Sequence, residues 1–135
     1  MTNIIQSETQ WILVAHELSQ IVQAGDLVTL TGPLGAGKTT LVKALGFVWG
    51  IENVTSPTFS LRQEYSGKRS LIHCDFYRLK NQDTALDVLP PDEDYSDKIV
   101  IVEWPEKVSS TLFVPFKNQY HIHIKLENGT RIIEW

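Results

Sequence analysis

The chain contains 135 residues, which fits one compact domain over residues 1–135 and excludes a two-domain enzyme. Hydrophobic residues make up 42% and charged residues 21% of the sequence, a composition typical of a folded globular protein. The 12 Lys and Arg residues are outnumbered by 16 Asp and Glu. The resulting net charge of -4 opposes direct binding of DNA or of another nucleic acid, and we expect any nucleic-acid role to be indirect, through a partner.

Neither a disulfide nor a membrane segment is expected. Cys74 is the single cysteine, which excludes an internal disulfide and a cysteine-rich metal site. No stretch approaches the roughly 18 apolar residues that a membrane span needs. The first residues also lack the basic cluster and apolar run of an export signal. We therefore expect a cytoplasmic protein that does not act in a membrane.

The first half of the chain predicts a helix, a strand, a glycine-rich loop and a second helix, in that order. Ser7 followed by Gln10 is a helix start signal, and apolar residues then recur at helical spacing until Gly25. The apolar run LVTLT at 27–31 predicts a strand. KTTLVKALGFVW at 38–49 predicts a helix that ends before the next glycine.

The second half predicts a hairpin, a short helix and a buried strand. Alternation in TFSLRQEY (58–65) and RSLIHCDFY (69–77) predicts two strands joined by a tight turn. NQDTALDVL (81–89) predicts a short helix. KIVIVEW (98–104) has the form of a strand that is buried on both faces of a parallel sheet.

The C-terminal segment predicts a second hairpin. YHIHIKLE at 120–127 alternates strictly, Asn128 and Gly129 favour a type I′ turn, and TRIIEW at 130–135 returns. Together these elements indicate an α/β fold, a three-layer P-loop NTPase-like domain. We expect a mostly parallel sheet with added antiparallel strands and a C-terminal hairpin, and a ligand at the carboxyl ends of the strands.

The glycine-rich loop carries the strongest functional signal. Residues 32–39 read GPLGAGKT and match the phosphate-binding pattern GxxxxGK[ST] at every fixed position. Backbone N–H groups of such a loop converge on an anion at the positive end of the helix dipole. Lys38, expected outside the core, is placed to reach the outer phosphates, and the Thr39 hydroxyl is placed to ligate Mg²⁺. Thr40 also fits a packing role in the helix. The candidate nucleotide-contacting residues are Gly32, Pro33, Leu34, Gly35, Ala36, Gly37, Lys38, Thr39 and Thr40.

A magnesium nucleotide site also requires carboxylates near the ends of strands. Glu103 ends KIVIVE and Asp75 ends SLIHCD, and the sequence does not rank the two. Each also has a structural interpretation: Asp75 as the ion-pair partner of Arg78, and Glu103 as a helix cap.

Three further side chains are candidates for this site. Thr58, in the SPTF segment at 56–59, offers a hydroxyl to a terminal phosphate, although the segment also fits a simple turn. Arg78 is a candidate for neutralising phosphoryl charge or for a surface ion pair. Trp104 is a candidate for the core, for shielding the site or for contacting a partner. A guanine-reading NKxD motif is missing from the sequence, which favours ATP over GTP.

GPLGAGKTT, SPTF, HCDFYRL and IVEWPE, in this order and at this spacing, resemble the motifs of the TsaE (YjeE) family of small bacterial ATPases. The resemblance runs from Thr9 almost to the C-terminus. It implies ATP binding and hydrolysis in association with TsaB and TsaD subunits. This activity supports the threonylcarbamoyladenosine (t6A37) modification of tRNA, in which TsaD carries out the transfer to tRNA.

The resemblance also implies roles for individual residues. Lys38 and Thr39 match the nucleotide loop, and Thr58 lies in a switch-like segment. Glu103 matches a Mg²⁺ ligand, and Asp75 matches the acid that supports hydrolysis. By the same resemblance, the catalytic set is Lys38, Asp75, Glu103 and Thr58, and the Mg²⁺ ligands are Thr39 and Glu103.

Two positions depart from the family pattern. Pro33 stands where such loops usually have an acidic residue, and LPPDEDY lacks the usual glycine, which leaves the helix length near Pro90 open. Neither is a fixed catalytic position, so we expect a Mg²⁺-dependent ATPase that is weak without its partner subunits. One alternative is a small-molecule kinase, although so short a chain leaves little material for an acceptor site and a lid. The other is a nucleotide-gated binding module with little turnover, because such sites often depend on groups supplied in trans.

Overall fold

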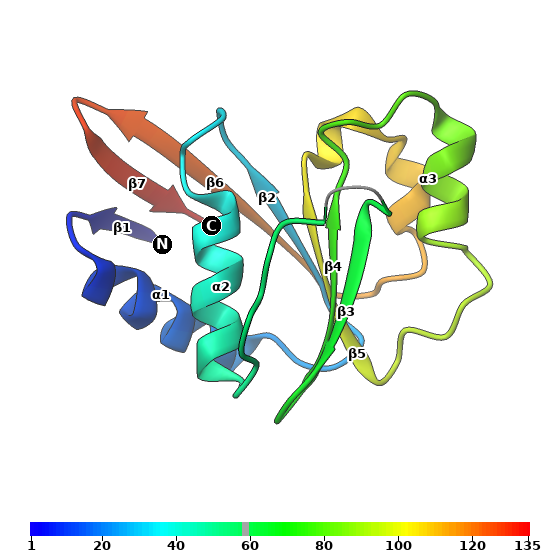
Figure 1. Cartoon of the computed structure of the whole chain (residues 1–135), viewed down its shortest axis with the longest axis horizontal. Coiled ribbons are helices and arrows are strands. Elements are labelled where there is room, and N and C mark those ends of the chain that lie inside the picture. Colours follow the sequence, from blue (N-terminus) through cyan, green and yellow to red (C-terminus); the bar gives the residue numbers. More distant parts are fainter. Residues whose placement is uncertain (58–59) are drawn as a thin grey trace.

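A seven-stranded β-sheet forms the centre of the protein and carries helices on both faces (Figure 1). The structure is a computed structural model that describes residues 1–57 and 60–135. Within them the strand order is β1-β7-β6-β2-β5-β4-β3. The strands are β1 (Thr2–Ile5), β2 (Leu27–Thr31), β3 (Arg62–Ser66), β4 (Ser70–Asp75), β5 (Lys98–Glu103), β6 (Gln119–Glu127) and β7 (Thr130–Glu134). The helices are α1 (Glu8–Ile21), α2 (Lys38–Val48) and α3 (Gln82–Val88), with short 3-10 helices η1 (Pro105–Lys107) and η2 (Ser110–Phe113).

Four parallel strands form the middle of the sheet. β2 pairs in parallel with β5 and with β6, and β5 pairs in parallel with β4. β2 and β5 are buried along nearly their whole length, as expected for apolar runs that are covered on both faces. Their carboxyl ends meet at one edge, where Asp75 of β4 lies opposite Glu103 of β5. The loop from β2 to α2 leaves the sheet at the same edge (Figure 1), so the phosphate loop and the two acids are neighbours.

Antiparallel strands extend this parallel core at both edges. β3 pairs with β4, with Ser66 opposite Ser70, which confirms the first hairpin. Its first strand begins at Arg62 and leaves out residues 60 and 61, which the alternating pattern included; residues 58 and 59 of that pattern lie outside the described residues. β6 and β7 form the expected C-terminal hairpin. Asn128 and Gly129 have φ angles of 50° and 76°, as a type I′ turn requires.

The sequence did not indicate β1 or the two 3-10 helices. β1 pairs antiparallel with β7 at the other end of the chain, with Ile4 opposite Ile132. Four residues are too few to establish a periodic pattern. The extended conformation of β1 therefore follows from tertiary pairing, which strand propensity alone does not reveal.

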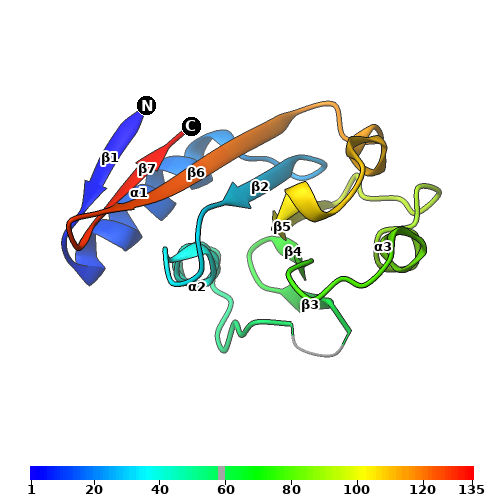
Figure 2. The ribbon, with the colours of Figure 1, turned by 90° about the horizontal axis from the view of Figure 1, so that it is seen from above.

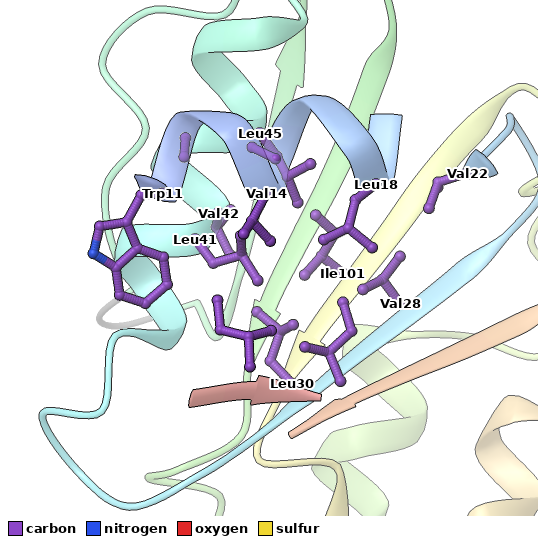
Figure 3. Packing of buried hydrophobic residues seen from close by; sticks show 14 of the residues in the cluster. Trp11, Val14, Leu18, Val22, Val28, Leu30, Leu41, Val42, Leu45 and Ile101 are labelled. Atoms are coloured by element: carbon purple, nitrogen blue, oxygen red, sulfur yellow. The ribbon is translucent and has the colours of Figure 1, made fainter. Parts of the chain in front are cut away.

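Two hydrophobic clusters lie on opposite faces of the sheet and give the three expected layers. On one face, Trp11 and Leu18 of α1 and Leu45 of α2 pack over the parallel strands (Figure 3). On the other face, α3 and η2 cover a second cluster that includes Phe76 and Leu112. Figure 2 shows α2 and α3 on opposite sides of β4 and β5. Burial of one large apolar side chain stabilises the folded state by about 1.5–3 kcal/mol. Because such side chains are buried on both faces of the sheet, each strand is held in the orientation that keeps them there.

The predicted starts of the helices agree with the structure, whereas α1 ends at Ile21, before the predicted stop at Gly25. α1 begins after Ser7, whose N–H donates to Gln10 Oε1 at 3.1 Å. α3 begins after Asn81, whose side chain accepts from Thr84 N, and it ends at Val88. No helix in residues 1–57 and 60–135 combines the length and apolarity of a membrane span.

Candidate nucleotide-binding site

The phosphate loop turns between β2 and α2 through Gly32, Gly35 and Gly37, whose φ angles are 154°, 77° and 116°. Two of these positions also lack space for a side chain. A Cβ on Gly32 would lie 2.5 Å from the Ile124 carbonyl oxygen, and a Cβ on Gly37 would overlap the Trp11 ring. Positive φ is disfavoured for L side chains. The glycines therefore let the chain pass closely between the hairpin and α1, and they leave the N-terminus of α2 open to an anion.

Lys38 is buried against its own loop, with only 5% of the residue exposed. Its Nζ donates to the carbonyl oxygens of Gly32 and Pro33 at 2.5 and 2.9 Å and lies 4.3 Å from the centre of the Trp104 ring. The expectation that this lysine lies outside the core is therefore wrong. Burial lowers the pKa of Lys38, and the negative charge of Glu103 opposes that effect. A lysine held in this way is a buried cation beside the loop that an anion would occupy.

Thr39 and Glu103 are brought into direct contact. Thr39 Oγ1 lies 3.1 and 2.9 Å from the two carboxylate oxygens of Glu103. Glu103 is only 2% exposed, and its Oε2 also lies 2.6 Å from Nε2 of His73. The structure thus gives Glu103 a place at the phosphate loop, and no helix-capping contact of its side chain is found among the described residues.

The oxygen atoms of Thr39 and Glu103 fit the ligand preference of Mg²⁺, which binds hard oxygen donors and retains several waters. Across the part of the chain that the structure describes, no three His, Cys, Asp or Glu side chains converge on one metal position. A magnesium ion would therefore take these two side chains together with phosphate and water oxygens, as is usual at nucleotide sites.

Asp75 lies at the end of β4, next to Glu103 in the neighbouring strand. Its Oδ1 accepts the backbone N–H of Tyr77 at 3.0 Å. Burial raises the pKa of Asp75, although the hydrogen bond from Tyr77 acts in the opposite direction. Among the described residues it forms no ion pair with Arg78, so the structural interpretation of Asp75 as the partner of that arginine lacks support.

Trp104 forms an aromatic wall beside Lys38. It adopts a left-handed conformation, with φ 60° and ψ 51°, and its ring lies 5.0 Å from that of Tyr77. Strained backbone of this kind costs about 1–3 kcal/mol and clusters at functional sites. The conformation turns the Trp104 ring toward the phosphate loop, where it contacts Lys38.

A cavity of about 460 Å³ lies in front of the loop. Five of its residues were not predicted from the sequence as site residues: Glu8, Trp11, Ser56, Tyr77 and Arg131. Arg131 Nε donates to the Ala36 carbonyl at 3.0 Å, and its Nη2 donates to that of Gly35 at 3.2 Å. No local signal identifies this arginine, because only the pairing of β7 with β6 brings it to the loop. The lining residues are Glu8, Trp11, Leu34, Gly35, Gly37, Lys38, Thr39, Thr40, Ser56, Asp75, Tyr77, Glu103, Trp104 and Arg131.

The remaining candidates have different outcomes. Thr40 is exposed and lines the cavity, which favours a binding role over helix packing. Ser56 also lines it, with its Oγ 3.2 Å from Thr39 Oγ1. Thr58, with its neighbour Phe59, lies outside the described residues, so its predicted role stays a prediction. Arg78 does not line this cavity but lines a smaller one of about 230 Å³ that shares Asp75 with it.

Residues 5–133 match the family described as "Threonylcarbamoyl adenosine biosynthesis protein TsaE". The chain belongs to the TsaE family. A TsaE protein of Mycobacterium bovis is 36% identical over 138 residues, covering 92% of this chain and 79% of the relative. A TsaE protein of Aquifex aeolicus is 40% identical over 112 residues, covering 77% and 76% of the two chains. Family membership confirms the resemblance carried by the sequence motifs.

A solved structure confirms the fold of this TsaE-family chain. The crystal structure of YdiB from Bacillus subtilis superposes with a TM-score of 0.70 and 27% identity, covering 98% of this chain and 82% of that one. The expected α/β architecture, a parallel core with added antiparallel strands, is therefore shared with a known structure. The comparison extends across the β1 and β7 edge as well as the phosphate loop, because it covers nearly the whole chain.

Proposed function

We propose that this TsaE-family chain binds and hydrolyses ATP with Mg²⁺, in support of the threonylcarbamoyladenosine modification of tRNA. The observation that carries the proposal is the contact between Thr39 and the buried Glu103 at the phosphate loop. A hydroxyl at the start of the loop's helix and a carboxylate at the end of a neighbouring strand are the two protein groups that a magnesium nucleotide requires.

The loop residues bind the phosphates, and Lys38 adds a positive charge. Backbone N–H groups after Gly35 and the N-terminus of α2 face the anion. Lys38 exchanges the carbonyl oxygens of Gly32 and Pro33 for outer phosphate oxygens, and this exchange gives stronger, charge-assisted hydrogen bonds. Thr39 and Glu103 would hold Mg²⁺, whose charge would neutralise part of the remaining phosphate charge.

The cavity continues from the phosphate loop toward α1 and β7, where Trp11, Glu8 and Arg131 form its wall. We place the nucleoside end of ATP there. The guanidinium of Arg131 offers a face on which a base can stack, and the edge of the largely buried Trp11 ring adds apolar wall. Arg131 also fixes the loop itself, because it donates to the carbonyl groups of Gly35 and Ala36.

Asp75 is the proposed acid of the hydrolytic step. It lines the cavity beside Glu103, and its raised pKa makes its carboxylate a better proton acceptor than a fully solvated aspartate. In this role Asp75 orients the attacking water and accepts its proton as phosphate is released. Thr58 and Arg78 remain candidates for contacting the terminal phosphate.

TsaB and TsaD subunits are the proposed partners, and tRNA is reached only through them. The net charge of -4 does not favour direct binding of tRNA. Two apolar side chains at the mouth of the cavity, Leu34 and Tyr77, are 63% and 40% exposed. A site whose rim is apolar and open to water is completed best by another protein surface, which also excludes water.

Release of phosphate by the purified chain tests this function, measured alone and with TsaB and TsaD. We expect slow Mg²⁺-dependent release that the partners accelerate, and tighter partner binding with an ATP analogue than with ADP. Phosphorylation of an acceptor instead of phosphate release would identify a kinase. Binding of ATP with no release, even with both partners, would identify a nucleotide-gated binding module. Failure to bind magnesium nucleotide would contradict the proposal.

A further inference from the structure

His73 is a fully buried histidine in the middle of β4, between the apolar Ile72 and the buried Cys74. It lies in β4 opposite Ile101 of β5, and none of its surface is exposed. It does not line the cavity in front of the phosphate loop. A buried polar ring costs free energy unless it is hydrogen-bonded. The contact of His73 with Glu103 offsets part of this cost, and it also links the histidine to the phosphate loop.

The geometry of that contact determines which ring nitrogen carries the proton. Nε2 of His73 lies 2.6 Å from Oε2 of Glu103. The same carboxylate already accepts from the Thr39 hydroxyl, so it is the acceptor and the imidazole is the donor. Among the described residues, Nδ1 of His73 has no hydrogen-bond partner. A ring with its proton on Nε2 satisfies the contact and buries no unpaired N–H donor.

We propose that His73 is a positioning residue that fixes the Glu103 carboxylate for Mg²⁺. This inference rests on the function proposed above. Without a second donor, the carboxylate would be held by Thr39 alone and could rotate about its terminal bond. The hydrogen bond from Nε2 selects the orientation in which both carboxylate oxygens face Thr39. Groups that orient a metal ligand in this way typically change metal affinity or activity by about 10–100-fold when removed.

Three variants separate positioning from general stability. His73→Leu fills the space but removes the donor. His73→Gln places an amide nitrogen near the position of Nε2 and restores a donor. Leu71→Ala is the matched control, because Leu71 is buried in the same strand, two residues away on the same face, and does not contact Glu103.

The first measurement is the Mg²⁺ concentration that half-saturates ATP-analogue binding, determined by calorimetry, with binding in EDTA as the reference. We expect His73→Leu to raise it about 10–100-fold, with little change in EDTA, and His73→Gln to stay within about threefold of wild type. Leu71→Ala should lower the Tm without moving the Mg²⁺ midpoint. An unchanged midpoint in His73→Leu, or an equal rise in Leu71→Ala, overturns the positioning role.

The second measurement needs neither metal nor nucleotide. Long-range ¹H–¹⁵N NMR of the wild-type protein reports which nitrogen of His73 carries the proton, and it remains decisive if a variant does not fold. We expect the Nε2–H tautomer, and a proton on Nδ1 alone would overturn the inference. A wild-type chain whose nucleotide binding does not depend on Mg²⁺ would overturn the proposed function and this inference together. A Mg²⁺-dependent wild type with an insensitive His73→Leu would overturn only the inference.

Discussion

Replacement of Lys38 with methionine removes the charge that we assign to the outer phosphates while it keeps an unbranched stem of similar length. The ammonium now bonds to two backbone carbonyl oxygens, those of Gly32 and Pro33, and must leave them to reach a nucleotide. Each charge-assisted hydrogen bond contributes about 1.5–3 kcal/mol. The two bonds now made to carbonyl oxygens are charge-assisted through the ammonium alone, whereas bonds to phosphate have a charge on both partners and are stronger. We take the gain on exchanging both bonds as the contribution of one charge-assisted bond, about 1.5–3 kcal/mol. That difference corresponds to about a 10- to 150-fold loss of ATP affinity.

The effect of Lys38→Met on stability should be small. The variant loses the two carbonyl contacts and the contact with the Trp104 ring. It also removes the burial of a charge, which is what lowers the pKa of Lys38. These effects oppose each other, so we expect the free energy of unfolding to change by no more than about 1 kcal/mol.

Calorimetry with ATP, phosphate release and thermal unfolding measure the three quantities directly. Lys43→Met is the matched control, because Lys43 lies in the same helix and its side chain is exposed. We expect wild-type ATP affinity in Lys43→Met and the predicted loss in Lys38→Met. A folded Lys38→Met variant that binds and hydrolyses ATP as well as Lys43→Met does would refute the assignment of the phosphate site.

The remaining predictions concern the two acids and the loop glycines. Glu103→Gln should raise the Mg²⁺ concentration needed for ATP hydrolysis more than Asp75→Asn does, because only Glu103 contacts Thr39; the reverse order in a Mg²⁺ titration would exchange their roles. Burial raises the pKa of Asp75, so the stability associated with its protonated form is present in acid and is lost as the pH rises through the raised pKa. Asp75→Asn should therefore melt above wild type at neutral pH, and a Tm difference that does not shrink in acid would contradict this reasoning. Gly37→Ala should cost at least about 2 kcal/mol in urea unfolding, from its positive φ and from overlap with the Trp11 ring. Gly35→Ala, with open space around it, should cost less, and equal losses would count against the overlap.

Local patterns predicted the parts of the site that follow one another along the chain. LVTLT, the glycine loop and the helix after it form a continuous unit, and the structure has β2 and α2 within that segment. Glu103 and Asp75 were identified because each ends an apolar strand, and parallel strands place such ends at one edge. What the sequence left open was their ranking, since contact with Thr39 depends on how the strands are ordered in the sheet.

Long-range pairing supplied the parts that the sequence did not predict. Arg131 reaches the loop only because β6 lies beside β2 and carries β7 with it. Trp11 reaches Gly37 through the packing of α1 on α2. His73 lies within an apolar stretch of β4, and only the pairing of β4 with β5 gives it a carboxylate partner. The burial of Lys38 has the same origin, because the loop and Trp104 enclose it from separate parts of the chain.

Two buried side chains of opposite charge, Lys38 and Glu103, lie together at the phosphate loop, and this arrangement couples the two ligands of the proposed site. Without a nucleotide, Lys38 is held by carbonyl groups and Glu103 by Thr39 and His73. ATP alone would compensate Lys38 but bring phosphate charge toward Glu103, and a cation alone would compensate Glu103 but repel Lys38. Bound together, each ligand offsets the charge that opposes the other, so each should raise the affinity of the other by the same factor. Glu103→Gln should remove most of that coupling, because it deletes the charge that repels the phosphates and attracts the metal, whereas Asp75→Asn should leave most of it in place.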